Sequence, residues 1–391
     1  MRLAFVVQRY GAEVAGGAEA LCRQTARALA AGGDEVVVYT TTARDYLTWA
    51  PHYPAGEERD GAVAVRRFAV ERPDPAASAA ALRTLGVRPG DAALEARWAR
   101  AQGPVSPALL AALERDRDRH EAVAFWTYLY ATTQLGLPLV ADRSVLVPLA
   151  HDEPMLRFGL TRGVLALAAG LAFLTPEERR LVDDLHGIGA RPWAEVGAGV
   201  DPGRPGEAGR ARVRWALPER FALYLGRVDG AKGVDALARA HDAYRRRGGE
   251  LGLVLAGRSA GGLRLPPWAV RTGYVDEAER ADLLAACELV ALPSPYESLS
   301  LAALEAWGAG RPTLATSASE VLAGQTARSG GGLLYTGPET YGRQLARLAG
   351  DPELRARLGG DGRAFAAGWT WAAAARRWRG LLARVRRPLT A

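Results

Sequence analysis

Residues 288–316 read ELVALPSPYESLSLAALEAWGAGRPTLAT, and this stretch decides the fold class. The apolar run at 288–293 predicts a buried strand. After a loop of small residues, the Ala- and Leu-rich segment 301–310 predicts a helix, and it ends in glycine as helices commonly do. A second apolar run at 312–316 predicts the next strand. Strand, helix and strand in this order are typical of a parallel α/β sheet.

The same alternation extends along the chain on both sides of this stretch. In the first half, we predict strands at 3–7, 35–40, 62–70, 122–130, 144–150 and 170–175, and helices at 16–33 and 176–185. In the second half, we predict strands at 221–226, 251–257 and 270–275, and a helix at 234–247. Residues 71–118 indicate helices joined by loops. Two such series predict two Rossmann-like domains, each a doubly wound parallel sheet.

A stretch rich in Gly, Pro and Arg separates the two series, and we place the linker there. The expected division is an N-terminal domain at 1–200, a linker at 201–218 and a C-terminal domain at 219–369. Ligands of doubly wound sheets bind at the carboxyl ends of the strands. We therefore expect the site in a central cleft that the two domains face.

Composition and charge restrict the class of protein. Of 391 residues, 49% are hydrophobic and 24% charged, as in ordinary globular proteins. The net charge of +7 suits nucleic acid, an anionic membrane face or a phosphorylated small molecule. Cys22 and Cys287 show no metal or redox spacing, and the apolar start is too short for a signal peptide. We expect a soluble, cytoplasmic protein.

Two glutamates mark the loop and helix of the opening stretch. Glu297 stands at the mouth of the helix, and Glu305 lies two turns further along. The backbone N–H groups of Ser298, Leu299, Ser300 and Leu301 would stand free at the helix start, which suits a diphosphate. The two carboxylates then fit a ligand with hydroxyls at both ends, a sugar and a ribose. The alternative is a capping acid followed by a solvated helix acid.

The stretch GRVDGAKGVD at 226–235 holds the only lysine among the 50 Lys and Arg residues. It follows the predicted strand 221–226, so Arg227 and Lys232 would flank a turn at the carboxyl end of that strand. Both could reach one phosphate group. The Gly and Ser/Thr spacing of a Walker loop is absent. A basic surface loop is the alternative.

Two motifs of the first half could contribute to a site. GGAE at 16–19 opens a helix, so Gly16, Gly17 and Glu19 mark a candidate approach point for a ligand. It is not GxGxxG, which argues against a dinucleotide dehydrogenase. His151 closes the predicted strand 144–150, at the edge facing the proposed cleft, although a lone histidine is usually structural. The acids of ERDRDRHE at 114–121 lie in a charged helical stretch, and we expect them on a solvated face rather than at a metal.

The C-terminal segment 368–387 predicts an amphipathic basic helix. One stripe of the helix is apolar, and the arginines lie off it. The stripe consists of Trp371, Trp378, Leu381, Leu382 and Val385. Such a helix either packs on the protein or lies on an anionic membrane.

Together these pieces resemble the retaining glycosyltransferases of family 4, whose two-domain fold is named GT-B. The resemblance covers nearly the whole chain. It is strongest in LYLGRVDGAKGVD, LVLAGR and the run from TGYVDEAER to WGAGRP, and the first half adds GGAE, HDEP and FLTPEERRLV. One departure is VGAGVD at 196–201, where the family usually has an asparagine before Gly-Val-Asp.

The resemblance implies a role for each matching position. It implies that Arg227 and Lys232 hold the donor diphosphate, that Glu305 binds the ribose and that Glu297 contacts the donor sugar. The implied donor-binding set also includes Gly17, Arg258, Tyr274, Val275 and the backbone of residues 298–301. His151 would lie beside the reacting carbon, so it joins Arg227, Lys232 and Glu297 as a catalytic residue, with Gly16 and Glu19 on the acceptor side. The C-terminal helix, 370–391, would pack back onto the N-terminal domain.

The expected activity is hexosyl transfer, with retention at the anomeric carbon, from a UDP- or GDP-sugar to an acceptor hydroxyl. Two cations at the diphosphate make a metal unnecessary, so we expect no metal and no cofactor. The acceptor would be a small molecule, a glycan or a lipid-linked molecule of polysaccharide, glycolipid or natural-product biosynthesis, and no nucleic acid is expected as a partner. The C-terminal arginines leave a peripheral contact with an anionic membrane open. The alternatives are a nucleotide-sugar epimerase of the same fold and a non-catalytic nucleotide or carbohydrate binder.

Overall fold

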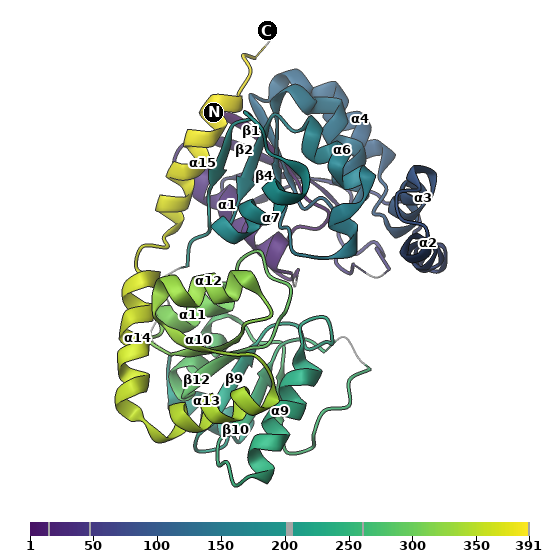
Figure 1. Ribbon diagram of the computed structural model, residues 1–391. Helices are drawn as coiled ribbons and strands as arrows, with labels where there is room; N and C mark the ends of the chain where they lie inside the picture. The colour runs from purple at the N-terminus through teal and green to yellow at the C-terminus, as the bar shows by residue number, and fades with distance from the viewer. Residues whose placement is uncertain (15, 47, 201–205, 260–261, 390–391) are drawn as a thin grey trace. The chain divides into compact units, whose positions relative to one another are not determined.

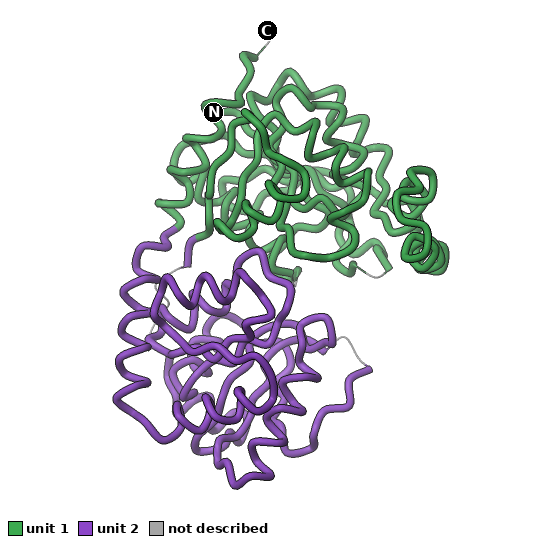
Figure 2. Tube along the Cα trace, in the orientation of Figure 1, with its two compact units in different colours: residues 1–198, 371–391 green, residues 199–370 purple. Residues whose placement is uncertain are grey.

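The structure, a computed structural model, describes residues 1–14, 16–46, 48–200, 206–259 and 262–389. The chain divides into two compact units (Figure 2). The first consists of residues 1–198 and 371–391, and the second of residues 199–370. Each unit is built around its own sheet.

The sheet of the first unit has the strand order β3-β4-β2-β1-β5-β6-β7-β8. The strands are β1 (Arg2–Val6), β2 (Glu35–Thr41), β3 (Gly56–Asp60), β4 (Val63–Phe68), β5 (Ala122–Trp126), β6 (Ser144–Val147), β7 (Gly170–Phe173) and β8 (Trp193–Glu195). All neighbours pair in parallel except β3 and β4. The six predicted strands are confirmed. The sequence did not predict β3, because its charged residues GEERD form an exposed edge without an apolar pattern.

Five of these strands end earlier than predicted, at Val6, Phe68, Trp126, Val147 and Phe173. After β5 and β6 the chain passes through residues with a left-handed backbone, Thr127 with φ 63° and Leu149 with φ 55°. The Cβ atom of any residue other than glycine makes this conformation unfavourable, so the surrounding contacts must hold it. His151 therefore stands in a loop beyond the strand rather than at its last residue.

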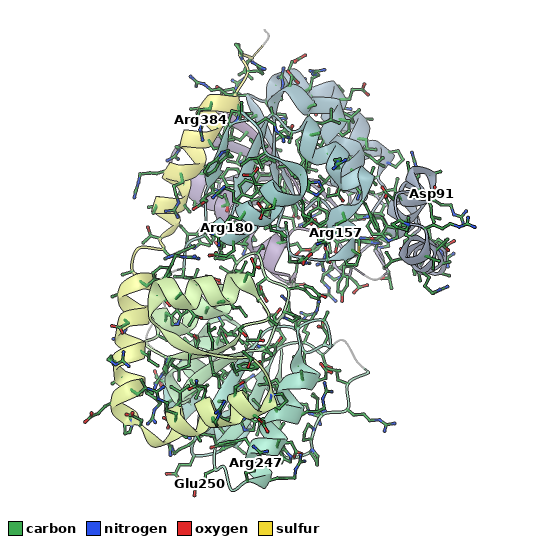
Figure 3. The ribbon with its side chains drawn as sticks, viewed as in Figure 1. Asp91, Arg157, Arg180, Arg247, Glu250 and Arg384 are labelled. Carbon is green, nitrogen blue, oxygen red and sulfur yellow. The ribbon has the colours of Figure 1, made fainter. Side chains whose placement is uncertain are left out.

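Helices cover the sheet of the first unit (Figure 1). They are α1 (Gly17–Ala31), α2 (Pro75–Val87), α3 (Ala92–Gln102), α4 (Pro107–Asp116), α5 (Ala131–Gly136), α6 (Gly159–Leu167), α7 (Pro176–His186) and α15 (Trp371–Val385). Polar residues cap several of them: the side chains of Asp74, Asp91 and Ser106 accept backbone N–H groups at the starts of α2, α3 and α4. Asp91 is labelled in Figure 3, at the end of the α2–α3 hairpin.

The C-terminal helix α15 packs on the first unit (Figure 1). Trp378 is fully buried, and its ring centroid lies 5.9 Å from those of Phe5 and Trp126. Its arginines bind the same unit: Arg384, labelled in Figure 3, donates to the carbonyl of Trp193 at 2.6 Å. Arg377 and Arg387 likewise donate to the backbone carbonyls of Val196 and Asp142, whereas Arg379 forms an ion pair with the carboxylate of Asp34 at 2.7 Å. Much of the basic face thus serves the protein's own backbone and acids.

The second unit has a fully parallel sheet in the order β11-β10-β9-β12-β13-β14. The strands are β9 (Phe221–Leu225), β10 (Gly252–Ala256), β11 (Val270–Gly273), β12 (Leu289–Leu292), β13 (Thr313–Thr316) and β14 (Gly332–Tyr335). The helices are α8 (Ala208–Trp215), α9 (Val234–Arg246), α10 (Glu277–Ala286), α11 (Leu301–Gly308), α12 (Glu320–Ser329), α13 (Pro338–Gly350) and α14 (Pro352–Ala366). The predicted strands and helices of this half are confirmed.

The segment 201–218, predicted as a linker, lies outside the described residues at 201–205. Its remainder forms α8, which packs against α10 within the second unit. Asp282 of α10 holds this helix: its carboxylate accepts the backbone N–H of Glu207 at 2.7 Å and the Arg210 side chain. A buried acid joined to an arginine and to a helix start is a structural fastening.

Candidate functional site

The carboxyl end of β9 leads into the loop that carries the lysine. Gly233 ends this loop with φ 71°, and a Cβ at that position would lie 2.5 Å from the carbonyl oxygen of Pro293. Only glycine allows so close an approach together with a left-handed backbone. The Lys232 loop is thereby laid against the loop that follows β12, although the two are about sixty residues apart in the chain.

An ion pair joins these two loops. The Lys232 ammonium lies 2.8 Å from a carboxylate oxygen of Glu297. Asp229 organises the turn, because one of its oxygens accepts the backbone N–H of Lys232 at 2.9 Å and the other pairs with Arg227. Tyr224 donates to the carbonyl of Arg227 at 2.6 Å. The structure thus brings Arg227, Lys232 and Glu297 to one edge of the sheet, held by Asp229, which the sequence analysis did not single out.

The loop after β12 enters α11 through Ser300. The Ser300 hydroxyl accepts the N–H of Ala303, as an N-cap does. Its own backbone N–H donates to the side chain of Gln325 at 2.9 Å. This corrects the expectation of four free amides from Ser298 to Leu301, since a glutamine from α12 already accepts the one at Ser300. Ser298, Leu299 and Leu301 flank this fixed position.

Glu305 lies on α11, one turn before the helix ends. Its side chain is 22% exposed, and Arg280 of α10 lies 3.2 Å from its carboxylate. Burial raises the pKa of the Glu305 carboxyl, and the charge of Arg280 opposes this shift. Glu305 is therefore a partly buried acid with a cationic neighbour rather than a solvated helix acid.

Arg258 and Tyr274 meet beyond the ends of β10 and β11. The Arg258 guanidinium lies 4.9 Å from the centroid of the Tyr274 ring, in cation–π contact. Tyr274 is 52% exposed, and Val275 beside it is partly buried. An exposed ring beside an arginine offers a flat surface on which a planar base can stack.

In the first unit, the GGAE motif forms the start of α1. Glu19 is buried, and its carboxylate pairs with Arg9 at 2.5 Å and with the Gln8 amide at 2.8 Å. A Cβ at Gly16 would collide with this carboxylate, whereas one at Gly17 would meet no atom within 4 Å. Gly16 and Glu19 thus form the turn into α1, whereas the backbone of Gly17 has open space beside it.

His151 is partly buried and belongs to a short chain of polar groups. Its Nδ1 lies 3.6 Å from one carboxylate oxygen of Glu153, and Tyr128 donates to the other at 2.5 Å. Burial raises the pKa of Tyr128 well above its ordinary value, so the phenol stays a neutral donor. Sequence reasoning missed Tyr128 and Glu153, although Glu153 lies in the quoted HDEP.

A buried acid lies next to this loop. Glu178, in the first turn of α7, accepts the backbone N–H of Ala150 at 2.8 Å and that of Leu174 at 2.6 Å. Burial raises the pKa of Glu178 to about 8, while the bonds from backbone N–H groups lower it. Glu178 follows Thr175 with the Thr-x-x-Glu spacing of a helix capping box. This spacing was the one feature of the sequence from which its role could have been predicted.

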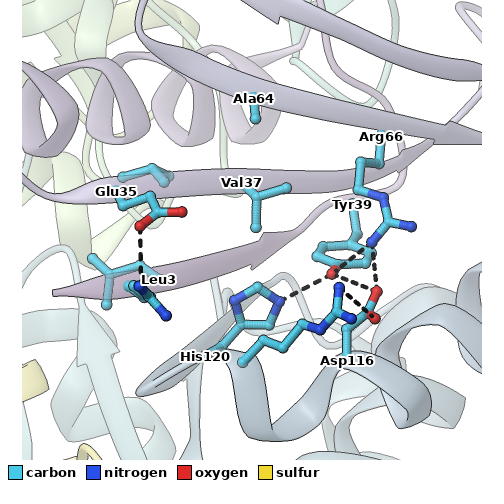
Figure 4. Close-up of a pocket in the computed structure, with 11 residues that line it drawn as sticks. Leu3, Glu35, Val37, Tyr39, Ala64, Arg66, Asp116 and His120 are labelled. Carbon is cyan, nitrogen blue, oxygen red and sulfur yellow. Dashed lines mark hydrogen bonds and ion pairs between the residues drawn. The ribbon is translucent and has the colours of Figure 1, made fainter. Parts of the chain in front are cut away.

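A cavity of about 370 Å³ lies in the first unit, at the amino end of β1 and β2 (Figure 4). Its polar groups satisfy one another: Asp116 accepts from Arg66 at 2.5 Å and from Tyr39 at 3.2 Å, and Tyr39 contacts His120. This corrects the prediction of a solvated face at 114–121 for Asp116, which is buried, while Asp118 is exposed. The cavity lies at the opposite edge of the sheet from His151.

Among the described residues, no three side chains of His, Cys, Asp or Glu gather as a metal site would require. No described helix has both the length and the apolar character needed to cross a bilayer.

Known sequences include relatives of this chain that are described as glycosyltransferases. A family model described as glycosyl transferases group 1 matches residues 219–351, within the second unit. A D-inositol 3-phosphate glycosyltransferase of Kineococcus radiotolerans is 30% identical over 68% of this chain and 72% of that protein. One of Stackebrandtia nassauensis is 30% identical over 56% of this chain and 55% of that protein. The chain spans 53% to 65% of the length of four such relatives.

Comparison with solved structures covers both units. Sucrose-phosphate synthase from Thermosynechococcus elongatus has a TM-score of 0.76 at 19% identity, over 98% of each chain. Anabaena HepE, in complex with UDP and glucose, has a TM-score of 0.68 at 17% identity, over 97% of this chain and 99% of that chain. Similarity at this level of identity is a statement about the fold alone.

Proposed function

The chain belongs to the glycosyl transferases group 1 family, and from this premise we propose that it moves a sugar from a nucleotide-sugar donor to an acceptor hydroxyl, with retention at the anomeric carbon. Its fold is GT-B, with two parallel-sheet α/β domains, as the sequence predicted. The observation that carries the proposal is the cluster of Arg227, Lys232 and Glu297 at the carboxyl edge of the second sheet.

In this proposal the second unit holds the donor. An ammonium has three protons, and the bond from Lys232 to Glu297 uses one, so the others remain for phosphate oxygens. Arg227 adds a planar set of donors, although its Nε already pairs with Asp229. As the bond between sugar and phosphate breaks, negative charge grows on the diphosphate, and these two cations stabilise it.

The remaining assignments follow the positions of the side chains. Glu305 binds the ribose hydroxyls, and the Arg258–Tyr274 pair takes the base. Glu297, bound to Lys232, orients toward the hydroxyls of the sugar rather than acting as a covalent nucleophile. The acceptor then attacks from the face that the diphosphate leaves, and the departing phosphate takes the acceptor's proton. We assign His151 a position beside the reacting carbon of the donor sugar.

UDP-sugars are the first donors to test, because the similar HepE is described in complex with UDP and UDP-glucose. The relatives named for D-inositol 3-phosphate suggest a phosphorylated polyol as the first acceptor. The basic net charge of +7 favours such an anionic acceptor.

A panel of nucleotide-sugars and a product analysis test the proposal. A true donor raises the melting temperature by mass action, so UDP- and GDP-sugars are compared with free UDP and GDP. The stabilising donor is then incubated with D-inositol 3-phosphate and with unphosphorylated inositol, and the anomeric configuration of the product is read by NMR. An α-linked product from an α-linked donor supports the proposal, and an inverted product contradicts the retaining mechanism.

The same experiment separates the two alternative functions. Epimerised sugar formed without any acceptor would identify an epimerase. Thermal stabilisation by the nucleotide-sugar with neither transfer nor slow hydrolysis, across the acceptor panel, would identify a binding protein.

A further inference from the structure

One buried carboxyl fastens the loop that carries His151. The two oxygens of Glu178 accept from different segments, Oε1 from the N–H of Ala150 at 2.8 Å and Oε2 from the N–H of Leu174 at 2.6 Å. The Glu178 residue is fully buried. Ala150 directly precedes His151, so the position of its peptide determines where the histidine side chain starts.

The local sequence places Glu178 at this point. Thr175 caps α7 and accepts the N–H of Glu178 at 3.2 Å, and Pro176 occupies the first helical position. β6 and β7 are parallel neighbours, so the loops that follow them leave the same edge of the sheet. The carboxyl therefore lies between these two loops and joins them.

The loop after β6 needs such an anchor. Pro148 has no backbone N–H to donate, and Leu149 is held with φ 55°. A left-handed backbone is unfavourable at a leucine and persists only where neighbouring contacts enforce it. The bond from Ala150 to Glu178 is such a contact, directly after the unfavourable residue.

We propose that Glu178 is a positioning residue for sugar transfer, which holds the peptide of Ala150 so that His151 is presented to the reacting carbon. The inference rests on the proposed function. Glu178 does not touch the substrate and acts through His151. Glu153, which accepts from Tyr128, lies in the same loop with a carboxylate oxygen 3.6 Å from the His151 Nδ1.

The variant Glu178→Gln tests this directly. Both oxygens of the Glu178 carboxyl can accept, with or without a proton on one of them, whereas a glutamine side chain has one acceptor oxygen and an NH2 group that cannot accept. In the variant, a backbone N–H bound to the second oxygen therefore loses its partner. A displacement on the order of 1 Å can reduce a rate about a hundredfold. We expect kcat to fall by roughly 10- to 100-fold, with the UDP affinity of the second unit unchanged.

Glu95→Gln is the matched control. Glu95 is also a buried glutamate of the first unit that accepts a backbone N–H, that of Leu160 at 2.9 Å. A glutamine oxygen can keep this single bond, so the control should retain kcat. A proportional loss in both variants, tracking a loss of folded protein, would make Glu178 merely structural and would overturn the proposal.

A double-variant comparison tests the route of the effect. If Glu178 acts through His151, then adding Glu178→Gln to His151→Ala should reduce kcat no further, because coupled residues are not additive. An equal loss in both backgrounds would overturn the proposal. If Glu178→Gln does not fold, Glu178→Asp takes its place: its side chain is one carbon shorter and cannot reach the N–H groups of both loops, so it should lower kcat in the same way. Unchanged turnover in that variant would also overturn it.

A measurement without turnover distinguishes this inference from the proposed function. The five histidines of the protein can be observed by 15N–1H NMR of their imidazoles. Glu178→Gln should shift the His151 signals and leave those of His241, in the other unit, unchanged. Unmoved His151 signals would overturn the inference, whereas a wild-type protein that transfers no sugar from any donor would overturn the proposed function alone.

Discussion

The Lys232 ammonium lies 2.8 Å from the Glu297 carboxylate, and these are two residues from different loops at one sheet edge. Lys232 is the only lysine among 50 basic side chains. A guanidinium is larger, planar and less strongly hydrated than an ammonium. The pair therefore gives a physical reason for lysine at this position: a compact cation can touch the glutamate and still direct protons at a phosphate.

We expect Lys232→Arg to lower kcat by roughly 10- to 100-fold, or about 1.4 to 2.7 kcal/mol of transition-state stabilisation. The charge stays, so attraction of the anionic donor should change little. The larger head group must displace either Glu297 or the diphosphate. Lys232→Ala should lose more, since the charge is lost as well. Steady-state kinetics at fixed ionic strength measure both.

The control is Arg247→Lys, an exchange in the opposite direction at an exposed site labelled in Figure 3, which should leave kinetics unchanged. If Lys232→Arg works as well as the parent, the compact cation has no role in catalysis.

Substitutions of the two glutamates of the donor site should impair different properties, UDP affinity for Glu305 and kcat for Glu297. Glu305→Ala should weaken UDP binding by about 10- to 100-fold, because hydrogen bonds to a charged group contribute about 1.5 to 3 kcal/mol. Glu297→Gln should keep the UDP affinity and lower kcat, since it contacts the sugar in our proposal. Calorimetry with UDP separates the two, with the exposed Glu250→Ala as control. Equal losses of UDP affinity in both variants would contradict this division of roles.

Activity should persist in excess EDTA. In our proposal Arg227 and Lys232 supply the positive charge that a divalent cation would otherwise bring to the diphosphate. The check is the initial rate with EDTA, then with added magnesium or manganese. Complete loss that either ion restores would refute the metal-independent mechanism.

The stability of the protein should depend on pH through Glu178. Burial raises the pKa of this carboxyl to about 8, above its ordinary value of 4.5, and Tyr128 is a titratable neighbour coupled to it. The folded state therefore holds a proton that the unfolded state releases, so the stability that this group contributes is complete below about pH 4.5. It decreases as the pH rises from about 4.5 through 8, by up to about 1.4 kcal/mol per pH unit, and changes no further once the folded state has also lost the proton.

Glu178→Gln removes this titration. The melting temperature of the variant relative to wild type should therefore increase between pH 5 and pH 9, measured by calorimetry in matched buffers. A difference that is constant across this range would show that Glu178 keeps an ordinary pKa.

Trp378→Ala should destabilise the protein by about 3 to 5 kcal/mol, the usual cost of removing a large buried aromatic side chain. Trp378 is fully buried between Phe5 and Trp126. Trp193→Ala is the matched control at a side chain that is 36% exposed, and it should cost much less. Denaturant unfolding of both variants measures the difference. A loss in Trp378→Ala as small as the one expected for Trp193→Ala would mean that Trp378 of α15 contributes little to the core of the first unit.

The order of strands and helices could be predicted because it depends on local pattern. The apolar run 288–293 and the helical spacing at 301–310 both appear within a few residues of each other, and β12 and α11 form there. Strand ends were less predictable, since Thr127 and Leu149 adopt backbones that distant contacts enforce. β3 was missed because pairing with β4, not its own composition, makes it a strand.

By itself, the sequence determined two series of parallel strands, the basic loop at 226–235 and the two glutamates near α11, because these follow from residue type and short-range spacing. Tertiary structure alone decided which partners these groups have. It joined Lys232 to Glu297, joined the Ser300 amide to Gln325, and used Glu178 to hold the peptide of Ala150. It also turned arginines of α15 toward carbonyls nearly two hundred residues away. The physical reason is that an ion pair or hydrogen bond requires two groups to lie a few ångströms apart in space. The number of residues between them along the chain does not determine that distance.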